Sequence, residues 1–291
     1  MGLFDNFKDK SREKRANEHH QHQSHRAEYL LNDDTPFDVT EAFRNLKAAL
    51  SVSVPKKNGG VAIMATSAFP EDGKTTVTVN LALMFAISDA KVILIDADIR
   101  KGRVAKYFKR KSAPGLSDYL SGQNSLEEVV HHSHVNANLS YITCGTHSPK
   151  PYELLESEEM KKLLQELRTQ YDYIIIDTPP VLLLSDALAL ATVTDGTVLV
   201  CRHQVSYMSD IQKALDALKF AKANVLGVVV NDYKAPKTKT YGGYKKYYYY
   251  SYSYGSTDPN ETDDEGTEGE NEEKPSTPAE TPSPAPTENK K

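Results

Sequence analysis

A strand-like apolar run at residues 60–66 leads into the segment AFPEDGKT at residues 68–75, and a helical pattern begins at Lys74. The segment matches the phosphate-binding pattern G-x-x-x-x-G-K-[ST] except at its first glycine, which is Ala68 here. Gly73 lets the backbone approach phosphate oxygens closely, and the start of the following helix adds its positive end. A strand, this loop and a helix in that order predict a P-loop nucleotide-binding unit.

The residue types of this loop suit a nucleoside triphosphate with its metal ion. Lys74 supplies a cation for the β- and γ-phosphates, and Thr75 offers a hydroxyl to Mg²⁺. Successive backbone amides of the loop form a nest for phosphate oxygens. We therefore predict ATP and Mg²⁺ as cofactors. The predicted nucleotide-binding residues of the loop are Pro70, Glu71, Asp72, Gly73, Lys74, Thr75 and Thr76.

Apolar runs and helical patterns alternate along the chain after this pattern begins. The predicted strands are Gly60–Thr66, Lys91–Asp96, Leu139–Cys144, Tyr173–Asp177, Thr197–Arg202 and Val225–Asn231. The predicted helices are Asp38–Val52, Lys74–Ser88, Ser125–His132, Ser157–Tyr171, Ser185–Thr192 and Met208–Ala221. Several strands are continuous Val, Ile and Leu, as expected of strands covered on both faces. The predicted fold class is α/β, a P-loop fold with a mainly parallel sheet and helices on both faces.

Composition divides the chain into four predicted parts. They are a flexible polar arm at residues 1–35, a P-loop domain at 36–233, a tyrosine-rich segment at 234–254 and a disordered acidic, proline-rich tail at 255–291. The tail holds 11 Asp and Glu against three Lys, a net charge of −8, and too few apolar residues to offset the entropy of ordering. Subtracting −8 from the whole-chain −5 leaves +3 for residues 1–254. Neither value argues for nucleic acid as a partner.

Several features predict a cytoplasmic protein without a membrane span of its own. No run of about 18 apolar residues exists in the chain, and no apolar region follows the basic residues of the N-terminus as in a secretory signal. The two cysteines, Cys144 and Cys201, support neither a disulfide framework nor a zinc site, so we expect reduced, buried thiols. The histidines at 19–25 are expected to belong to a solvated polar arm.

Two buried strands end in acidic residues. Asp96 and Asp98 follow one predicted strand, and Asp177 ends another. In open parallel sheets, ligands bind beyond the carboxyl ends of the strands. One such acid alone favours a helix-capping role, but two acidic strand ends beside a phosphate loop favour Mg²⁺ chemistry.

The loop, DADIR at residues 96–100 and IDTPP at 176–180 together resemble the bacterial tyrosine kinases that control capsule and exopolysaccharide synthesis. The likeness covers about residues 36–254, and the Asp-x-Asp pair matches that family's additional Walker-type motif. It implies a cytoplasmic kinase recruited to the inner face of the cell membrane, of the split Gram-positive form without a fused transmembrane part. It also implies assembly in rings, a separate transmembrane activator and an opposing tyrosine phosphatase.

A cluster of tyrosines follows the predicted P-loop domain. Its members are Tyr241, Tyr244, Tyr247, Tyr248, Tyr249, Tyr250, Tyr252 and Tyr254. An aromatic linker, a stacking surface for sugars or single-stranded nucleic acid, and an interaction tail are the alternatives. Beside a site that resembles a kinase, we favour a cluster of phosphoacceptors.

The residue types of the predicted site suggest further roles. Lys74 holds the phosphates, and Asp96 accepts the proton of the tyrosine hydroxyl, although Asp96 and Asp98 could exchange roles. Thr75, Asp98 and Asp177 hold the metal ion. Arg100 and Arg103 are candidates for stabilising charge on the transferred phosphoryl group, and surface roles without phosphate are the alternative. Asn231 resembles the family's base-recognising position, and a helix-capping or turn role is the alternative.

Glu41, Arg44 and Lys47 lie at positions i, i+3 and i+6 of the leading helix. They resemble the family's subunit-contact motif Glu-x-x-Arg-x-x-Arg, although Lys47 cannot form the bidentate pair that arginine forms. An ordinary solvated helix face is the alternative.

Two other function classes are alternatives to a kinase. A partitioning-type ATPase of the same fold would carry an additional lysine near the position of Phe69, and no tyrosine tail. An inert scaffold would have a damaged loop, whereas Gly73, Lys74 and Thr75 are intact.

Overall fold

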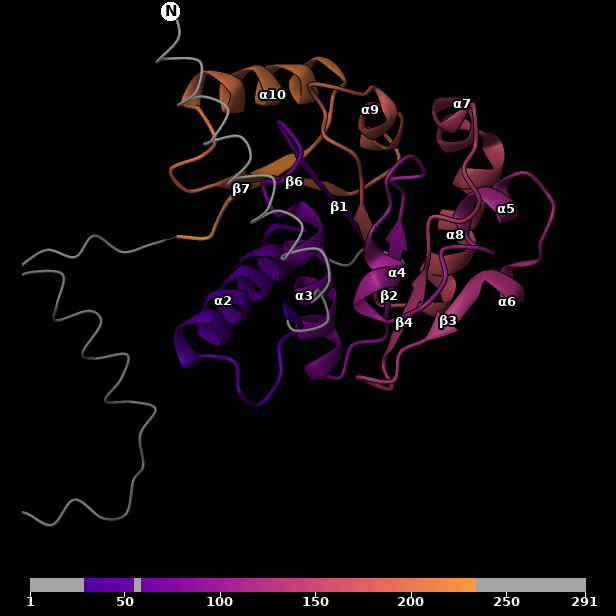
Figure 1. The fold of residues 1–291 in the computed structure, drawn as a ribbon, viewed down its shortest axis with the longest axis horizontal. Helices are drawn as coiled ribbons and strands as arrows, with labels where there is room; N and C mark the ends of the chain where they lie inside the picture. Colours follow the sequence, from indigo (N-terminus) through magenta and orange to yellow (C-terminus); the bar gives the residue numbers. More distant parts are fainter. Residues whose placement is uncertain (1–28, 55–58, 234–291) are drawn as a thin grey trace, which may run out of the picture. The chain divides into compact units, whose positions relative to one another are not determined.

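The computed structural model of the chain describes residues 29–54 and 59–233, and these residues contain a seven-stranded sheet between two layers of helices (Figure 1). The strands are β1 (Val61–Ser67), β2 (Val92–Asp96), β3 (Val130–His132), β4 (Leu139–Ile142), β5 (Tyr173–Asp177), β6 (Gly196–Arg202) and β7 (Val225–Asn231). The helices are α2 (Phe37–Ser53), α3 (Lys74–Ile87), α4 (Val104–Tyr107), α5 (Leu116–Leu120), α6 (Leu126–Val129), α7 (Pro151–Glu156), α8 (Glu158–Gln170), α9 (Asp186–Ala191) and α10 (Met208–Phe220).

The strands lie in the order β3-β4-β2-β5-β1-β6-β7, and every pairing is parallel except that of β3 with β4. The carboxyl ends of six strands therefore meet at one edge of the sheet. The phosphate loop, the Asp-x-Asp loop and the end of β5 all lie there. This confirms the predicted α/β P-loop fold.

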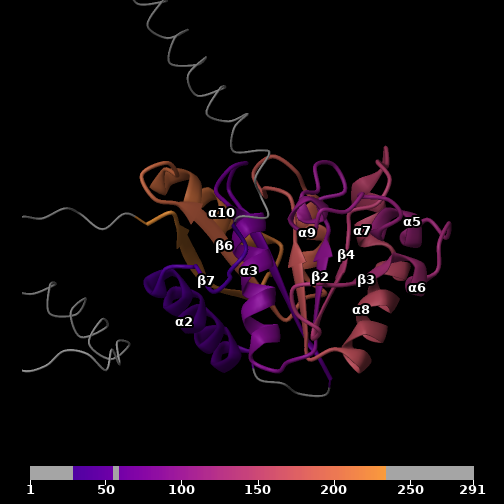
Figure 2. The same ribbon diagram turned by 60° about the horizontal axis from the view of Figure 1, so that its bottom comes forward.

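Alternate residues of the central strands enter two separate cores. Ile63 and Leu94 pack with α2 and α3 on one face, whereas Met64 and Ile93 pack with α8, α9 and α10 on the other (Figure 2). Every residue of β1, β2 and β5 is buried, as the continuous apolar runs predicted.

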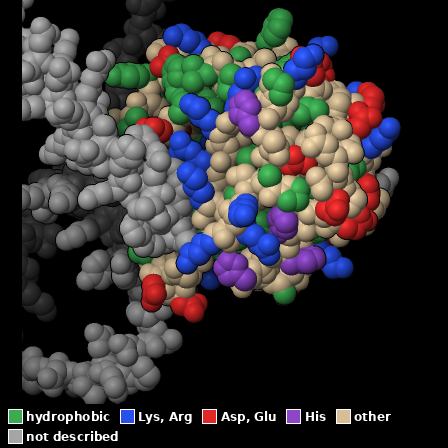
Figure 3. Space-filling model, turned by 45° about the vertical axis from the view of Figure 1, so that its right-hand side comes forward, with side chains coloured by type: hydrophobic (Ala, Val, Ile, Leu, Met, Phe, Trp, Pro, Cys, Tyr) green, Lys and Arg blue, Asp and Glu red, His purple; other side chains and the backbone are tan. Residues whose placement is uncertain are grey.

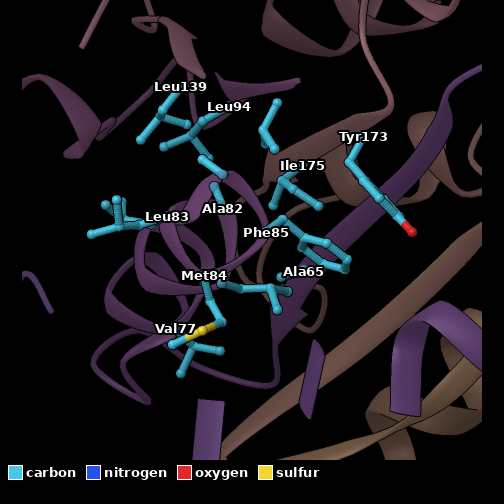
Figure 4. Packing of buried hydrophobic residues seen from close by; sticks show 14 of the residues in the cluster. Ala65, Val77, Ala82, Leu83, Met84, Phe85, Leu94, Leu139, Tyr173 and Ile175 are labelled. Atoms are coloured by element: carbon cyan, nitrogen blue, oxygen red, sulfur yellow. The ribbon is translucent and has the colours of Figure 1, made fainter. Parts of the chain in front are cut away.

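Helix α3 contributes most of its apolar side chains to the first core. Phe85 has no exposed surface and stacks on Tyr173 with ring centroids 4.0 Å apart (Figure 4). Burying a side chain of this size contributes about 1.5–3 kcal/mol. Because the helix that begins at the phosphate loop is held along its whole length, the loop starts from a fixed support.

Most predicted boundaries lie within one residue of the structure, and two ends differ by more. The predicted strand Leu139–Cys144 ends at Ile142. The predicted helix Ser125–His132 ends at Val129, and the next three residues form β3. The side chain of Glu128 accepts a hydrogen bond from the Ser125 amide and caps this single turn, but β4 offers an open edge with which the following residues pair. The short helices α4, α5 and α7 were not predicted, because each is too brief to show a helical period.

The packed part of the chain begins before residue 36, the predicted domain start. Leu30 and Leu31 are buried in the core of α2 and α3. The side chain of Asn80 holds this segment, since its oxygen accepts from the Leu31 amide at 2.8 Å and its amide donates to the Tyr29 carbonyl at 2.7 Å. Among the described residues, no helix is long and apolar enough to cross a membrane.

Candidate active site

The phosphate loop joins β1 to α3 at the carboxyl edge of the sheet. Glu71 and Gly73 adopt left-handed backbone conformations, with φ of 74° and 87°. A Cβ on Gly73 would lie 1.9 Å from Nδ2 of Asn231, so glycine is required by space as well as by φ. Asn231, at the end of β7, donates from this same Nδ2 to the carbonyl of Asp72 at 3.1 Å. The predicted base-recognising residue therefore touches the loop itself, and its contact with a base stays a prediction.

Asp72 fastens the loop to the turn that follows β6. Ser206 donates to Oδ1 of Asp72 at 2.7 Å, and the Phe69 amide donates to Oδ2 at 3.3 Å. Burial raises the pKa of Asp72, while the hydrogen bond from Ser206 opposes that rise. The Asp72 carboxylate thus links the phosphate loop to the turn after β6 by hydrogen bonds. Ser206 was missed because it lies 134 residues away in an unremarkable turn.

Lys74 lies among the predicted metal-binding residues. Its Nζ is 3.4 Å from Oδ2 of Asp98 and 3.4 Å from each oxygen of Asp177. Thr75 donates from Oγ1 to Oδ2 of Asp177 at 2.6 Å. Asp177 is completely buried, and Asp98 is 6% exposed. Side chains from the starts or ends of three elements, predicted separately, therefore converge at one point.

The charges of this cluster do not balance. Burial opposes the charge of Lys74, but Asp177, Asp98 and Asp96 stabilise the ammonium, and the net effect raises the pKa of Lys74. Burial also raises the pKa of Asp177. Three carboxylates surrounding one ammonium favour the arrival of another cation.

The oxygen atoms of the cluster fit Mg²⁺. The described residues contain no group of three His, Cys, Asp or Glu placed to hold a metal ion. Mg²⁺, however, is commonly bound by one or two carboxylates together with substrate phosphates and water. Thr75, Asp98 and Asp177 supply that partial set, so the site suits an ion that arrives with a nucleotide.

Asp96 is the last residue of β2, and the loop that follows this strand folds back over its side chain. It has no exposed surface and accepts hydrogen bonds from the amides of Val104 at 2.9 Å and Asp98 at 3.3 Å. Burial and the nearby carboxylate of Asp177 raise the pKa of Asp96 well above its usual range. Gly102 is required here, because a Cβ would lie 2.6 Å from Oδ2 of Asp96.

Cys144 lies on the other side of Gly102. Its Sγ would be 2.5 Å from a Cβ at position 102, and burial with the charge of Asp96 raises the pKa of the thiol to about 12. Both cysteines are free and buried, as predicted.

Arg100 forms an ion pair that sequence reasoning missed. Its Nε donates to Oδ2 of Asp186 at 2.7 Å, and a terminal nitrogen donates to Oδ1 at 3.2 Å. The side chain of Asp186 is 1% exposed. These hydrogen bonds raise the pKa of Arg100, and the negative charge of Asp98 raises it further. An acid inside the apolar run at residues 181–191 was the available signal.

The remaining predicted residues lie outside this cluster or outside the described chain. Arg103 precedes α4, and no ion pair to it exists within residues 29–54 and 59–233. Thr76 hydrogen bonds to Tyr107 at 2.7 Å, away from Lys74. Arg44 pairs with Glu41 within α2, and Lys47 lies one turn further on. The eight tyrosines of the cluster lie beyond residue 233, outside the described residues.

The fold and this loop define a P-loop nucleotide-binding protein. Residues 71–225 match the family model described as AAA domain. The chain is similar to the solved cell division ATPase MinD of Pyrococcus furiosus, with a TM-score of 0.52 and 25% identity over 61% of this chain and 74% of that chain.

The similarity to tyrosine kinases is stronger. The tyrosine-protein kinase YwqD of Bacillus subtilis is 41% identical over 182 residues, 62% of this chain and 76% of that protein. The kinase domain of Escherichia coli tyrosine kinase ETK has a TM-score of 0.62 and 31% identity, covering 72% of this chain and 87% of that domain. The chain belongs to the bacterial tyrosine kinase family, as the resemblance predicted. It spans 29% of the length of full etk and between 26% and 30% of several other curated relatives.

Proposed function

We propose that this chain transfers the γ-phosphoryl group of ATP to tyrosine hydroxyls, foremost those of its own tyrosine cluster at 241–254. The observation that carries the proposal is the convergence of Lys74, Asp98 and Asp177 at the phosphate loop of a bacterial tyrosine kinase fold. A phosphate binder and metal ligands at one point meet the needs of phosphoryl transfer, which depends on positioning and on charge stabilisation.

The residues of the site have distinct roles in this reaction. Lys74 and the loop amides hold the phosphates, and Thr75, Asp98 and Asp177 hold the Mg²⁺ ion, which neutralises phosphate charge when bound. The tyrosine oxygen forms a bond to the γ-phosphorus as the bond to the bridging oxygen breaks and ADP leaves. Asp96 accepts the hydroxyl proton, because a tyrosine with a pKa near 10 is protonated at neutral pH.

The cellular setting is also part of the proposal. We infer a role in capsule or exopolysaccharide synthesis, since one relative, from Klebsiella pneumoniae, is described as a tyrosine-protein kinase in the cps region. The proposed partners are further copies of the chain in a ring, a separate transmembrane activator that recruits it to the inner face of the cell membrane, and a tyrosine phosphatase.

The test is incubation of the purified chain with Mg-ATP and the activator's cytoplasmic segment, followed by phosphotyrosine mapping by mass spectrometry. We expect phosphate within the cluster at 241–254, and none in Lys74→Met, because that variant lacks the ammonium that holds the phosphates. Its circular dichroism spectrum should match that of the wild type. Equal phosphotyrosine in both proteins would contradict the kinase proposal.

A partitioning-type ATPase is the second candidate, supported by the similarity to MinD. Phe69 stands where that class typically carries an additional lysine, and the likeness to ETK is higher in both identity and TM-score. Release of inorganic phosphate without phosphotyrosine would favour this reading.

A further inference from the structure

A run of cations follows the catalytic Asp-x-Asp pair. Residues 101–111, here called the basic run, carry six Lys and Arg and no Asp or Glu. The face that carries α4 is turned toward the reader in Figure 3, where Lys and Arg side chains form a band. In the part of the chain that the structure describes, no salt bridge involves any of the six. The exposed members are Lys101, Lys106, Lys109, Arg110 and Lys111.

Apolar residues between the cations hold the basic run in place. Val104, Tyr107 and Phe108 are buried, and the ring of Phe108 stacks on Tyr141 with centroids 4.1 Å apart. The hydroxyl of Tyr107 hydrogen bonds to Thr76, in the first turn of α3, at 2.7 Å. The cations are therefore displayed on a surface tied to the phosphate loop.

The basic run also begins at the catalytic carboxylates. The Lys101 amide donates to Oδ1 of Asp98 at 2.9 Å, and the Val104 amide donates to Oδ2 of Asp96. β2 and β7 run in the same direction, so the chain leaves both at the same edge of the sheet. β7 ends at this edge, and the tyrosine cluster begins at Tyr241, ten residues after Asn231 in the sequence.

The complementary charge lies next to the tyrosines in the sequence. Residues 258–273, here called the acidic run, contain nine Asp and Glu and no Lys or Arg. The run begins four residues after Tyr254. Four residues span at most about 14 Å, so an anchored acidic run keeps the last tyrosines close to its anchor.

We propose that the basic run is a docking surface for the acidic run of another copy of this chain, and that docking delivers the tyrosine cluster to the active site. The inference rests on the proposed kinase function. The six cations follow the catalytic carboxylates in the sequence, and the nine anions follow the acceptor tyrosines. The two runs are therefore opposite in charge, and each adjoins one of the two groups that must meet in the reaction. Without the basic run, the carboxylates of the site would repel an acidic substrate.

The predicted signature is a change in KM without a change in kcat. The exposed lysines of the basic run are assigned no contact with ATP or with the acceptor hydroxyl, so their loss should alter how tightly the substrate binds and not how fast it reacts. Exposed ion pairs are individually weak and are screened beyond a Debye length of about 8 Å at physiological salt. The increase in KM should therefore require substitution of several charged residues, and it should become smaller at high salt.

The test uses full-length chains in two roles. The enzyme carries Tyr→Phe at all eight tyrosines and Asn or Gln for the nine acids, so its own tail neither reacts nor competes. The acceptor is Lys74→Met protein with either the native or the neutralised acidic run. We expect the KM for the neutralised acceptor to be about tenfold higher, equivalent to about 1.4 kcal/mol, with kcat unchanged.

Charge reversal on the enzyme locates the surface. The triple variant Lys106→Glu, Lys109→Glu, Lys111→Glu should raise the KM for the native acceptor to that of the neutralised one, and leave the KM for ATP unchanged. The matched control is the triple variant Lys91→Glu, Lys219→Glu, Lys222→Glu, which changes three exposed lysines near the opposite edge of the sheet. Both triples include one lysine at positive φ, Lys222 in the control and Lys109 in the basic run. Equal effects of both triples, or equal KM values for both acceptors, would overturn the proposal.

Direct binding separates this inference from the kinase proposal. A fluorescent peptide of residues 255–273 should bind the tail-neutralised Lys74→Met chain, and the basic-run triple should weaken that binding about tenfold. Such binding without any phosphotyrosine would refute the kinase function and retain the docking surface. Binding of the native chain to phosphatidylserine vesicles through the basic run, with no binding of the peptide, would instead make this surface a membrane contact and refute docking.

Discussion

Asp96 is a carboxyl group with no exposed surface, placed beside Asp177 and held by two backbone amides. Burial raises its pKa well above 3.8, so the folded chain holds this proton more tightly than the unfolded chain does. Folding is then favoured by protonation, and the contribution of Asp96 to stability declines as pH rises from about 3.8 toward the folded pKa.

Asp96→Asn should therefore increase the stability of the chain at neutral pH relative to the wild type, while it slows phosphoryl transfer. Without nucleotide, the Tm of the variant relative to the wild type should increase between pH 4.5 and pH 7.5, because asparagine has no proton to lose. Transfer should fall by roughly 10² or more, as expected from losing a general base. Differential scanning fluorimetry at both pH values and initial rates with Mg-ATP measure the two effects.

Asp98→Asn is the comparison for this experiment, since Asp98 lies in the same cluster. A Tm difference that stays constant with pH in Asp96→Asn would show that Asp96 is already ionised at low pH. Phosphoryl transfer by Asp96→Asn at the wild-type rate would assign the role of base to Asp98.

Between elements, the Arg100–Asp186 pair joins the loop after β2 to the first turn of α9. Arginine presents two donors in a rigid plane, so the bidentate pair sets the direction of the guanidinium as well as its position. The charge of Asp98 also contributes to the raised pKa of Arg100, so the guanidinium and the proposed metal-binding carboxylate influence each other. Asp186 is therefore a positioning residue for a candidate charge-stabilising arginine.

Asp186→Asn should lower kcat about tenfold or more and change the KM for ATP little, because Arg100 loses its orientation while the phosphate loop is untouched. Arg100→Lys should behave similarly, since an ammonium cannot make the paired contact. In the double variant the losses should not add, as expected of residues that act together. Higher kcat in Asp186→Asn would instead show that the pair holds Arg100 away from the reaction.

For the whole molecule, α2 is the element to which the resemblance assigns subunit contacts. It lies beside α3, and both views show it at the side of the sheet that ends in β7 (Figures 1 and 2). Arg44 is more than half exposed and pairs only with Glu41 among the described residues. An exposed arginine in such a pair can exchange its partner for one on a neighbouring copy.

Arg44→Glu should shift the chain toward monomers, because the new carboxylate and Glu41 would repel the acidic side chain of a neighbouring copy that pairs with Arg44. Multi-angle light scattering at physiological salt measures the mass. Lys161→Glu is the matched control, since Lys161 forms an equivalent i, i+3 pair with Glu158 on α8. An unchanged mass in Arg44→Glu, or an equal loss in the control, would remove the subunit contact from α2.

The phosphate loop, the central strands and the main helices could all be predicted from the sequence. Their signals are local: the Gly73-Lys74-Thr75 pattern after an apolar run, continuous apolar strands, and helical periods of apolar residues. Asp96, Asp98 and Asp177 could be placed at one edge because parallel strands end there. Short elements such as α4 and β3 could not, because four residues carry no period and an edge strand depends on its partner.

The amino-acid sequence alone determined the class of fold, the family and the residues that meet at the phosphate loop, because chain connectivity and residue type carry that information. Only the tertiary structure decided which side chains hold those residues in place. The contacts of Ser206 with Asp72, of Asp186 with Arg100 and of Asn231 with the Asp72 carbonyl each join residues 86 to 159 positions apart in the sequence. Such contacts depend on distances between separate elements, which exist only once the sheet has brought their ends together.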